Sequence, residues 1–173
     1  MSPLGASGAE TTLHTEEQRR PEMSDEITPT EIRKKLTEVL GHSSVDLATS
    51  KNGVNWATSA YFANLDEDLF RLTLILENSG RTLDQLRANP NVGVKVVPGG
   101  IAEPFAQGLG TVTLRDEADR DETFQALLRK EPQIEPFFAT PVTAIVVDID
   151  WWRVTHLGGG WLPGKVLERN ADA

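Results

Sequence analysis

The chain of 173 residues contains no cysteine. This absence excludes disulfides, thiol nucleophiles and zinc or iron–sulfur sites held by cysteine. Basic side chains are also scarce, since 17 lysines and arginines stand against 26 aspartates and glutamates, for a formal net charge of -9. A general electrostatic attraction to nucleic acid or to an anionic membrane surface is therefore not expected. Any phosphate group that this protein binds must be held by a local arrangement of donors.

Long apolar segments are missing as well. No run of about 18 apolar residues occurs, so no transmembrane helix is expected. The N-terminal segment also lacks the apolar core of a secretory signal, and a cytoplasmic protein is the simplest expectation. Its small and polar composition predicts a disordered extension over residues 1–24, in which Met23 is a second possible start. We expect one domain over residues 25–165 and a C-terminal tail over residues 166–173.

Several well-known catalytic motifs are absent too. The sequence has no G-x-S-x-G of a hydrolase, no phosphate-binding loop and no paired histidines at metal-ligand spacing. No metal site is expected. A glycine triplet at residues 158–160 follows an expected strand but opens no convincing helix, which disfavours a dinucleotide-binding fold.

The segment over residues 28–40 has the pattern of an amphipathic helix with a defined start. Thr28 precedes a proline and stands three residues before Glu31, which predicts a capping box. The apolar residues that follow fall on one helical face, and Gly41 is the expected stop.

Strand patterns fill much of the remaining chain. Alternating residues lead into Asn52-Gly53, a strong hairpin signal, and residues 69–76 alternate with one strongly apolar face. The other expected elements are strands at 91–97, 105–114 and 142–157, the last with a break near Asp150, and helical segments at 80–88, 116–130 and 131–138. Because strands and helices do not alternate regularly, we predict a mainly β (α+β) protein: an antiparallel barrel of about six strands with peripheral helices.

The turn before the helix at 80–88 is unusually polar. Ser79 is the expected N-cap of this helix. A helix N-terminus offers free N–H groups and a partial positive charge, so Asn78, Ser79, Arg81 and Thr82 together would form a local anion site.

A simpler interpretation of this turn remains open. In it, Ser79 only caps the helix, and Arg81 pairs with Glu77 or Asp84.

The order of elements over about residues 28–160 resembles the pyridoxamine 5'-phosphate oxidase-like superfamily of FMN-binding split barrels. The segment GRTLDQLRANPNVGVKV, residues 80–96, is similar to the turn, helix, NLRxNP and strand of that family. The resemblance implies a six-stranded antiparallel split β-barrel with peripheral helices. It also implies a homodimer that binds FMN at the subunit interface, or in some relatives the deazaflavin F420 or haem.

In such proteins a Ser-Arg-Lys turn holds the flavin phosphate. Counted back from Asn89-Pro90, the serine position falls on Gly80, the arginine on Arg81 and the lysine on Thr82. A shift of one residue instead aligns Ser79 with the serine and Arg81 with the lysine. In both registers the positive charge rests mainly on Arg81.

The resemblance implies further candidates on two strands. Thr58 and Ser59 are possible donors to the flavin ring, and Gln107 lies where relatives often have a polar residue that reaches it. Trp56 and Tyr61 have opposite strand parity, so only one of them is expected to face a bound ring. Packing in the core or at a dimer interface is the alternative interpretation for both aromatic residues.

The segment DWWRVTHLGGGW, residues 150–161, loosely resembles the Gly-Gly-Phe-Gly stretch of haem-utilisation split barrels, and His156 is a candidate haem ligand or a surface residue. Together with the expected anion site, the resemblance to FMN-binding split barrels implies an FMN-dependent oxidoreductase that transfers a hydride to or from a small organic substrate, with no catalytic residue assigned. The alternatives are a non-catalytic protein that binds haem, F420 or another ligand, and a structural barrel without a cofactor.

Overall fold

The computed structural model describes residues 27–170. The expected extension over residues 1–24 lies outside the described residues. None of the described helices is long and apolar enough to cross a membrane.

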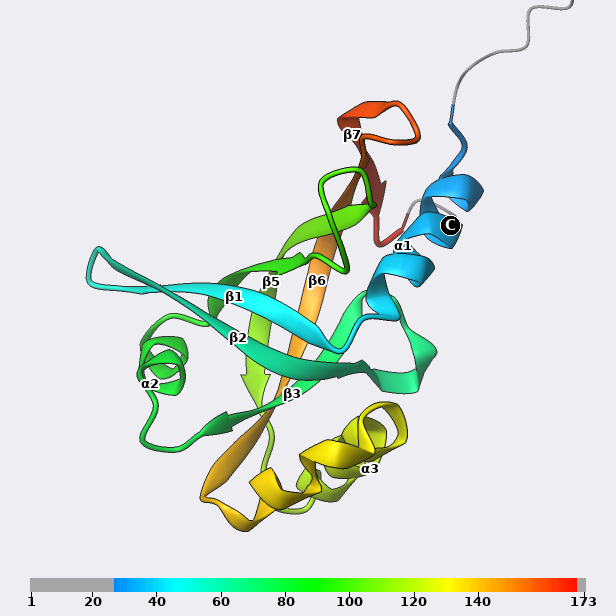
Figure 1. Cartoon of the computed structure of the whole chain (residues 1–173). Coiled ribbons are helices and arrows are strands. Elements are labelled where there is room, and N and C mark those ends of the chain that lie inside the picture. The colour runs from blue at the N-terminus through cyan, green and yellow to red at the C-terminus, as the bar shows by residue number, and fades with distance from the viewer. Residues whose placement is uncertain (1–26, 171–173) are drawn as a thin grey trace, which may run out of the picture.

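The described chain forms a closed barrel with one added strand (Figure 1). All strand pairs are antiparallel, and the strands follow the order β3-β2-β1-β4-β5-β6-β7, with a further pairing between β3 and β6 that closes the barrel. The strands are β1 (Ser44–Lys51), β2 (Val54–Asn64), β3 (Arg71–Glu77), β4 (Asn91–Val96), β5 (Phe105–Leu114), β6 (Val142–His156) and β7 (Trp161–Glu168). The predicted six-stranded antiparallel barrel is confirmed, and β7 is a seventh strand outside it.

Helices surround the barrel. They are α1 (Pro29–Leu40), α2 (Arg81–Ala88) and α3 (Arg120–Lys130), with the 3-10 segments η1 (Leu65–Glu67) and η2 (Pro132–Ala139). The capping box of α1 is confirmed, because Thr28 Oγ1 accepts from the Glu31 N–H while Glu31 accepts from the Thr28 N–H. The helix expected from residue 116 begins only at Arg120.

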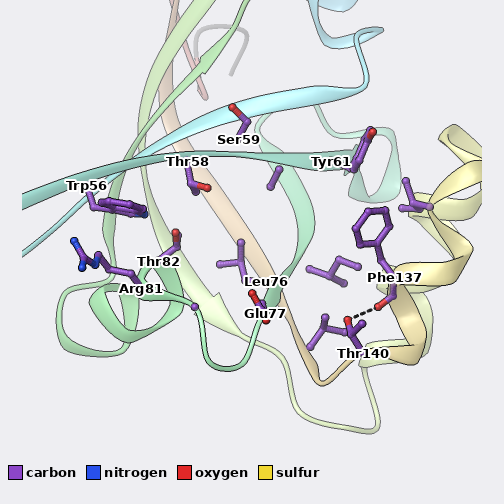
Figure 2. Close-up of a pocket in the computed structure, with 15 residues that line it drawn as sticks. Trp56, Thr58, Ser59, Tyr61, Leu76, Glu77, Arg81, Thr82, Phe137 and Thr140 are labelled. Atoms are coloured by element: carbon purple, nitrogen blue, oxygen red, sulfur yellow. Dashed lines mark hydrogen bonds between the residues drawn. The ribbon is translucent and has the colours of Figure 1, made fainter.

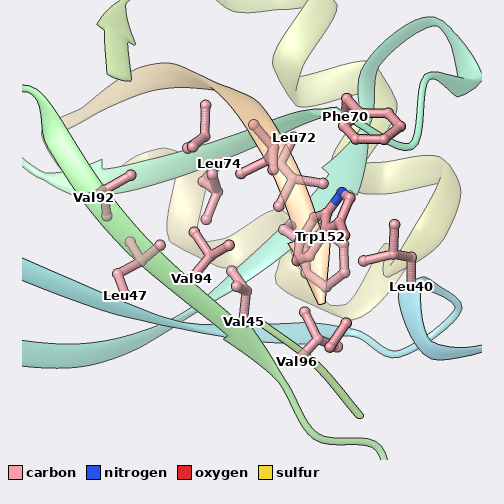
Figure 3. Close-up of a cluster of buried hydrophobic side chains, with 14 of the residues drawn as sticks. Leu40, Val45, Leu47, Phe70, Leu72, Leu74, Val92, Val94, Val96 and Trp152 are labelled. Carbon is pink, nitrogen blue, oxygen red and sulfur yellow. The ribbon is translucent and has the colours of Figure 1, made fainter. Parts of the chain in front are cut away.

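The core fills the barrel interior. The predicted apolar face of β3 is buried. The Trp152 ring of β6 lies among side chains of β3, β1 and β4 (Figure 3). The Trp152 indole N–H donates to the Leu69 carbonyl over 2.9 Å, so its one polar atom is satisfied inside the core. The buried set shown in Figure 3 includes Leu40, Val45, Leu47, Phe70, Leu72, Leu74, Val92, Val94 and Val96.

The glycines of β5 allow a close approach of β6. A Cβ atom on Gly110 would lie 2.4 Å from the Asp148 carbonyl oxygen, and one on Gly108 would lie 2.9 Å from the Trp151 carbonyl oxygen. The register shifts between Leu109 and Gly110, where Asp150 is the extra residue of a bulge. The break expected near Asp150 is therefore a bulge within one continuous strand.

The C-terminal boundary differs from the expected one. Strand β7 runs to Glu168, so residues 166–168 pair with β6 instead of belonging to the tail expected over 166–173. The glycine triplet before β7 closes the β6–β7 hairpin, with Gly160 at a φ of 74°. The position of the triplet in this hairpin turn explains its glycines, and a role in nucleotide binding is not needed to explain them.

The pairing of β2 with β3 in the closed barrel is short, which leaves an opening between the remaining parts of these two strands. These strands pair only through Phe62–Asn64 and Leu72–Leu74, whereas β1 pairs with β2 along its whole length. Residues 54–61 of β2 therefore have a free edge on the side of β3. Helix α2 lies below the β1–β2 hairpin at one end of this opening, and η2 lies near the other end (Figure 1).

Candidate functional site

A groove of about 640 Å³ occupies the opening between β2 and β3 (Figure 2). This volume lies within the usual range of small-molecule sites. Its walls come from β2, the end of β3, the start of α2, η2 and the start of β6. The lining residues are Trp56, Thr58, Ser59, Ala60, Tyr61, Ile75, Leu76, Glu77, Gly80, Arg81, Thr82, Ile134, Phe137, Thr140 and Val142.

One end of the groove is the N-terminus of α2. Gly80 is the N-cap, and no side chain of the described residues caps the helix, so its first N–H groups are left for a ligand or for water. The expectation that Ser79 caps this helix is wrong, because the Ser79 hydroxyl donates to Glu77 Oε1 over 3.2 Å instead. A Cβ atom on Gly80 would lie 3.0 Å from the Glu77 carbonyl oxygen, so the turn at this position is tight.

Arg81 lies at the same end of the groove, with its guanidinium carbon 4.6 Å from the centre of the Trp56 ring. Asp84, one of the expected partners of Arg81, instead forms an ion pair with Lys51, whose Nζ lies 2.8 Å from Asp84 Oδ2. Within residues 27–170, Arg81 forms no ion pair with Asp84 or Glu77. The interpretation of Arg81 as a helix-surface ion pair is therefore wrong, and its charge is available to a ligand.

Thr82 adds a hydroxyl to this end. The side chain is buried to 7% exposure, and its oxygen points toward the groove in Figure 2. No side-chain hydrogen bond of Thr82 is present within the described part of the chain. The turn thus supplies helix N–H groups, a guanidinium and a hydroxyl at one place.

The middle of the groove runs along β2. Thr58 points into it, whereas Ser59 points to the other side of the strand (Figure 2), where its hydroxyl donates to Asp46 Oδ1 over 2.6 Å. The side-chain hydroxyl of Ser59 is therefore engaged, and any contact from this residue to a ligand would come from its backbone. The free edge of β2 presents such backbone N–H and C=O groups.

The far end of the groove is aromatic. The rings of Tyr61 and Phe137 lie with their centres 6.4 Å apart at an angle of 51°. Trp56 and Tyr61 both line the groove despite their opposite parity, because the groove follows the free edge of β2 and not one face of it. The opposite strand parity of Trp56 and Tyr61 therefore excludes neither ring from the groove.

Other candidate residues lie outside the groove. Asn78 accepts a hydrogen bond from the Thr143 hydroxyl over 2.6 Å, so it joins the turn to β6. Gln107 lies on β5 opposite Lys95 and Arg153, and the structure does not bring it to the groove. Ser79 belongs to the turn but does not line the cavity.

The described histidines also lie elsewhere. His42 Nε2 is 3.3 Å from the Ser44 hydroxyl, and the His156 ring contacts the edge of Trp161 with ring centres 6.2 Å apart. Within residues 27–170, no three histidines or carboxylates gather in a way that would hold a metal ion.

Sequence reasoning missed the contribution of η2. Phe137, Ile134 and Thr140 were not singled out, because nothing in a short proline-containing segment indicates which barrel opening it will cover. The only signal for a role of Phe137 in the groove would have been that its ring is not buried in the core. The sequence does not show whether a side chain is exposed.

Comparison with known proteins gives matches at the level of structure alone. No protein-family model matches the chain, and no curated protein matches it by sequence. Among solved structures, a haem-binding protein from Mycobacterium smegmatis superposes with a TM-score of 0.68 at 14% identity, covering 84% of this chain and 60% of that one. A FAD-binding protein from Mesorhizobium loti has a TM-score of 0.58 at 18% identity, covering 74% and 94%.

A Listeria innocua protein described as a pyridoxamine 5'-phosphate oxidase has a TM-score of 0.55 at 18% identity, covering 73% of this chain and 96% of that one. The closed six-stranded barrel and these superpositions agree. The chain has the split-barrel fold of pyridoxamine 5'-phosphate oxidase-like proteins. The similar structures thus include both a FAD-binding protein and a haem-binding protein.

Proposed function

We propose that this split barrel is a flavin-dependent oxidoreductase that binds FMN in the groove between β2 and β3. The observation that carries the proposal lies at one end of a groove of ligand size, where the N-terminus of α2 and the guanidinium of Arg81 lie together. Among residues 27–170, no side chain caps this helix and no carboxylate pairs with Arg81. In a protein with a net charge of -9, this is a specific place for a phosphate group.

The residues of the groove fit such a cofactor. The first N–H groups of α2, the Arg81 guanidinium and the Thr82 hydroxyl are donors of the kind that a phosphate monoester requires. Along the middle of the groove, Thr58 and the free backbone edge of β2 offer donors and acceptors for the heteroatoms of a flavin ring. A bound flavin would itself supply the chemistry of hydride transfer.

The tasks left to the chain are binding, orientation and exclusion of water. Arg81 rests on Trp56, which restricts the guanidinium and lowers the entropy lost when it binds an anion. Leu76, Ile75 and Val142 give the groove an apolar floor, which reduces the access of water to a bound ring. No acid or base of the groove needs to act for these tasks.

A second candidate function is a haem-binding protein without catalysis. It is favoured by the superposition on the Mycobacterium smegmatis haem-binding protein, and Arg81 could pair with a propionate as well as with a phosphate. It ranks second because neither described histidine lines the groove. The deazaflavin F420, which also carries phosphate, would use the same end of the groove as FMN.

We also propose that the protein acts as a homodimer on a small organic substrate. The resemblance to split barrels supports this assembly. The groove is open to one side along the free edge of β2, so a second copy could complete its wall.

The test is a titration of the purified full-length protein with FMN, F420 and haemin, followed by absorbance and by quenching of tryptophan fluorescence. Trp56 lies in the groove, so ligand binding there should quench its emission. We expect saturable binding of FMN with one ligand per chain. Binding of haemin alone, with a Soret band and no response to FMN, would contradict the proposal and support the second candidate.

A further inference from the structure

The exposed aromatic residues of this protein are gathered in one place. Among the large apolar side chains that are exposed in the described part of the chain, three are aromatic: Trp56 at 39% exposure, Tyr61 at 39% and Phe137 at 55%. All three line the groove. Exposed aromatic rings that gather in a concave site of ligand size indicate a binding surface.

Phe137 owes its exposure to the way η2 is anchored. Ile134 is buried against α3, and Phe138 stacks on Phe124 with ring centres 4.1 Å apart. The Thr140 hydroxyl and N–H both bond to the Phe137 carbonyl, over 2.7 Å and 3.1 Å, which fixes the backbone at the end of the segment. Phe137 is thus held rigidly while its ring faces Tyr61 across the end of the groove.

The two ends of the groove have different chemistry. Arg81 and the α2 N-terminus form the cationic end, and the rings of Tyr61 and Phe137 form an aromatic end on the other side of Thr58 (Figure 2). The tilted pair of rings leaves ring faces and edges directed at the space between them, an arrangement suited to a flat aromatic molecule. The proposed cofactor would use the cationic end for its phosphate and the middle of the groove along Thr58 for its ring, so the proposed cofactor contacts do not include the aromatic end.

We infer that Tyr61 and Phe137 form a substrate subsite for uncharged, planar conjugated molecules such as quinones. A reduced flavin would give its hydride to the quinone and become oxidised, and the quinone would take a proton from water to become a hydroquinone. The inference rests on the proposed function, since a hydride acceptor must lie beside the flavin ring. Tyr61 and Phe137 set specificity here: they place the acceptor, and the redox step belongs to the cofactor. The absence of a charged side chain at this end of the described groove disfavours an anionic substrate.

The experiment measures the dissociation constants of two probes, menadione and FMN, by isothermal titration calorimetry. The variants are Phe137→Ala and, as a matched control, Ile101→Ala, which removes an exposed apolar side chain from the β4–β5 loop away from the groove. Phe137→Ala should raise the menadione dissociation constant by about fivefold or more and change that of FMN by less than about twofold. Ile101→Ala should change neither.

Three results would overturn the subsite. Menadione binding could be unaffected by Phe137→Ala, FMN binding could weaken as much as menadione binding, or the variant could lose a dimer that the wild type forms in light scattering. The last result would make Phe137 an interface residue. A substitution of Tyr61→Phe, which keeps the ring, should retain menadione binding, and its loss would contradict recognition by ring stacking.

The subsite and the proposed function fail in different ways. If the wild type does not bind FMN but binds menadione in a manner that depends on Phe137, then the flavin proposal is wrong and the aromatic subsite stands. If FMN binds and menadione does not, then the subsite is wrong and the flavin proposal stands.

Discussion

At the start of α2, the guanidinium of Arg81 lies over the ring of Trp56 and has no carboxylate partner among the described residues. Acidic side chains are abundant in this chain, so an arginine that is left unpaired beside free helix N–H groups is informative. The neighbouring Lys51 neutralises Asp84, which would otherwise compete for Arg81. The charges around this turn therefore leave one cation for a ligand.

Lys130 is the residue whose ionisation should be visible in the stability of the protein. Burial lowers its pKa from 10.5 to about 8, partly opposed by the charge of Glu131. Its ammonium donates to the Leu40 carbonyl over 2.8 Å and lies 3.5 Å from the centre of the Phe62 ring. Lys130 thus joins the end of α3 to the end of α1.

The pH dependence follows from the direction of this shift. Between about pH 8 and the ordinary lysine pKa near 10.5, the unfolded chain binds more protons at this residue than the folded chain, so the free energy of unfolding should rise with pH. Urea unfolding across this range should show that Lys130→Met removes this rise, while Lys34→Met, at an exposed position on α1, retains it. Equal pH dependence in Lys130→Met and the wild type would contradict the assignment.

At the scale of elements, the approach of β5 to β6 depends on glycine. The added methyl group of Gly110→Ala would meet the Asp148 backbone, which cannot move without disturbing the β5–β6 pairing. We expect a loss of about 1–3 kcal/mol in the free energy of unfolding, measured in urea. Gly93→Ala on β4 is the matched control, because its methyl group would make ordinary contacts at 3.6 Å with Ala48, and it should change stability by less than about 1 kcal/mol. Similar losses in both variants would exclude the steric explanation.

Local signals made several elements predictable. The capping box fixed the start of α1, Asn89-Pro90 ended α2, and the alternation of β3 identified its buried face, because each depends on residues close in sequence. The cap of α2 was not predicted correctly. Ser79 and Gly80 are both acceptable N-cap residues, and only the hydrogen bond from Ser79 to Glu77 decides between them.

At the scale of the whole molecule, the groove could be predicted only in part. Arg81 and Thr82 were identified because they lie in a recognisable polar turn, and Thr58 was identified through the resemblance to split barrels. The contribution of Phe137 could not be predicted, since it depends on where α3 and η2 pack after the barrel closes through β3 and β6. Gln107 illustrates the opposite error: its strand was predicted correctly, but barrel closure places it away from the groove.

The domain boundary gives a prediction for the whole chain. The capping box at Thr28 and the packing of Ile27 on the core both lie after Met23. A protein that begins at Met23 should therefore have the same melting temperature and oligomeric state as the full chain, measured by calorimetry and light scattering. A marked fall in melting temperature would show that the removed residues contribute to the fold.

Phosphate binding by Arg81 and the α2 N-terminus can be measured by comparing FMN with riboflavin, which lacks the phosphate. Calorimetric titration should show that the wild type prefers FMN by about tenfold or more, equivalent to about 1.4 kcal/mol. Arg81→Ala should lose most of this preference with little change in riboflavin binding, while Arg87→Ala, at the other end of α2, should retain it. A wild type without preference for FMN, or an Arg81→Ala variant that keeps the full preference, would contradict the account.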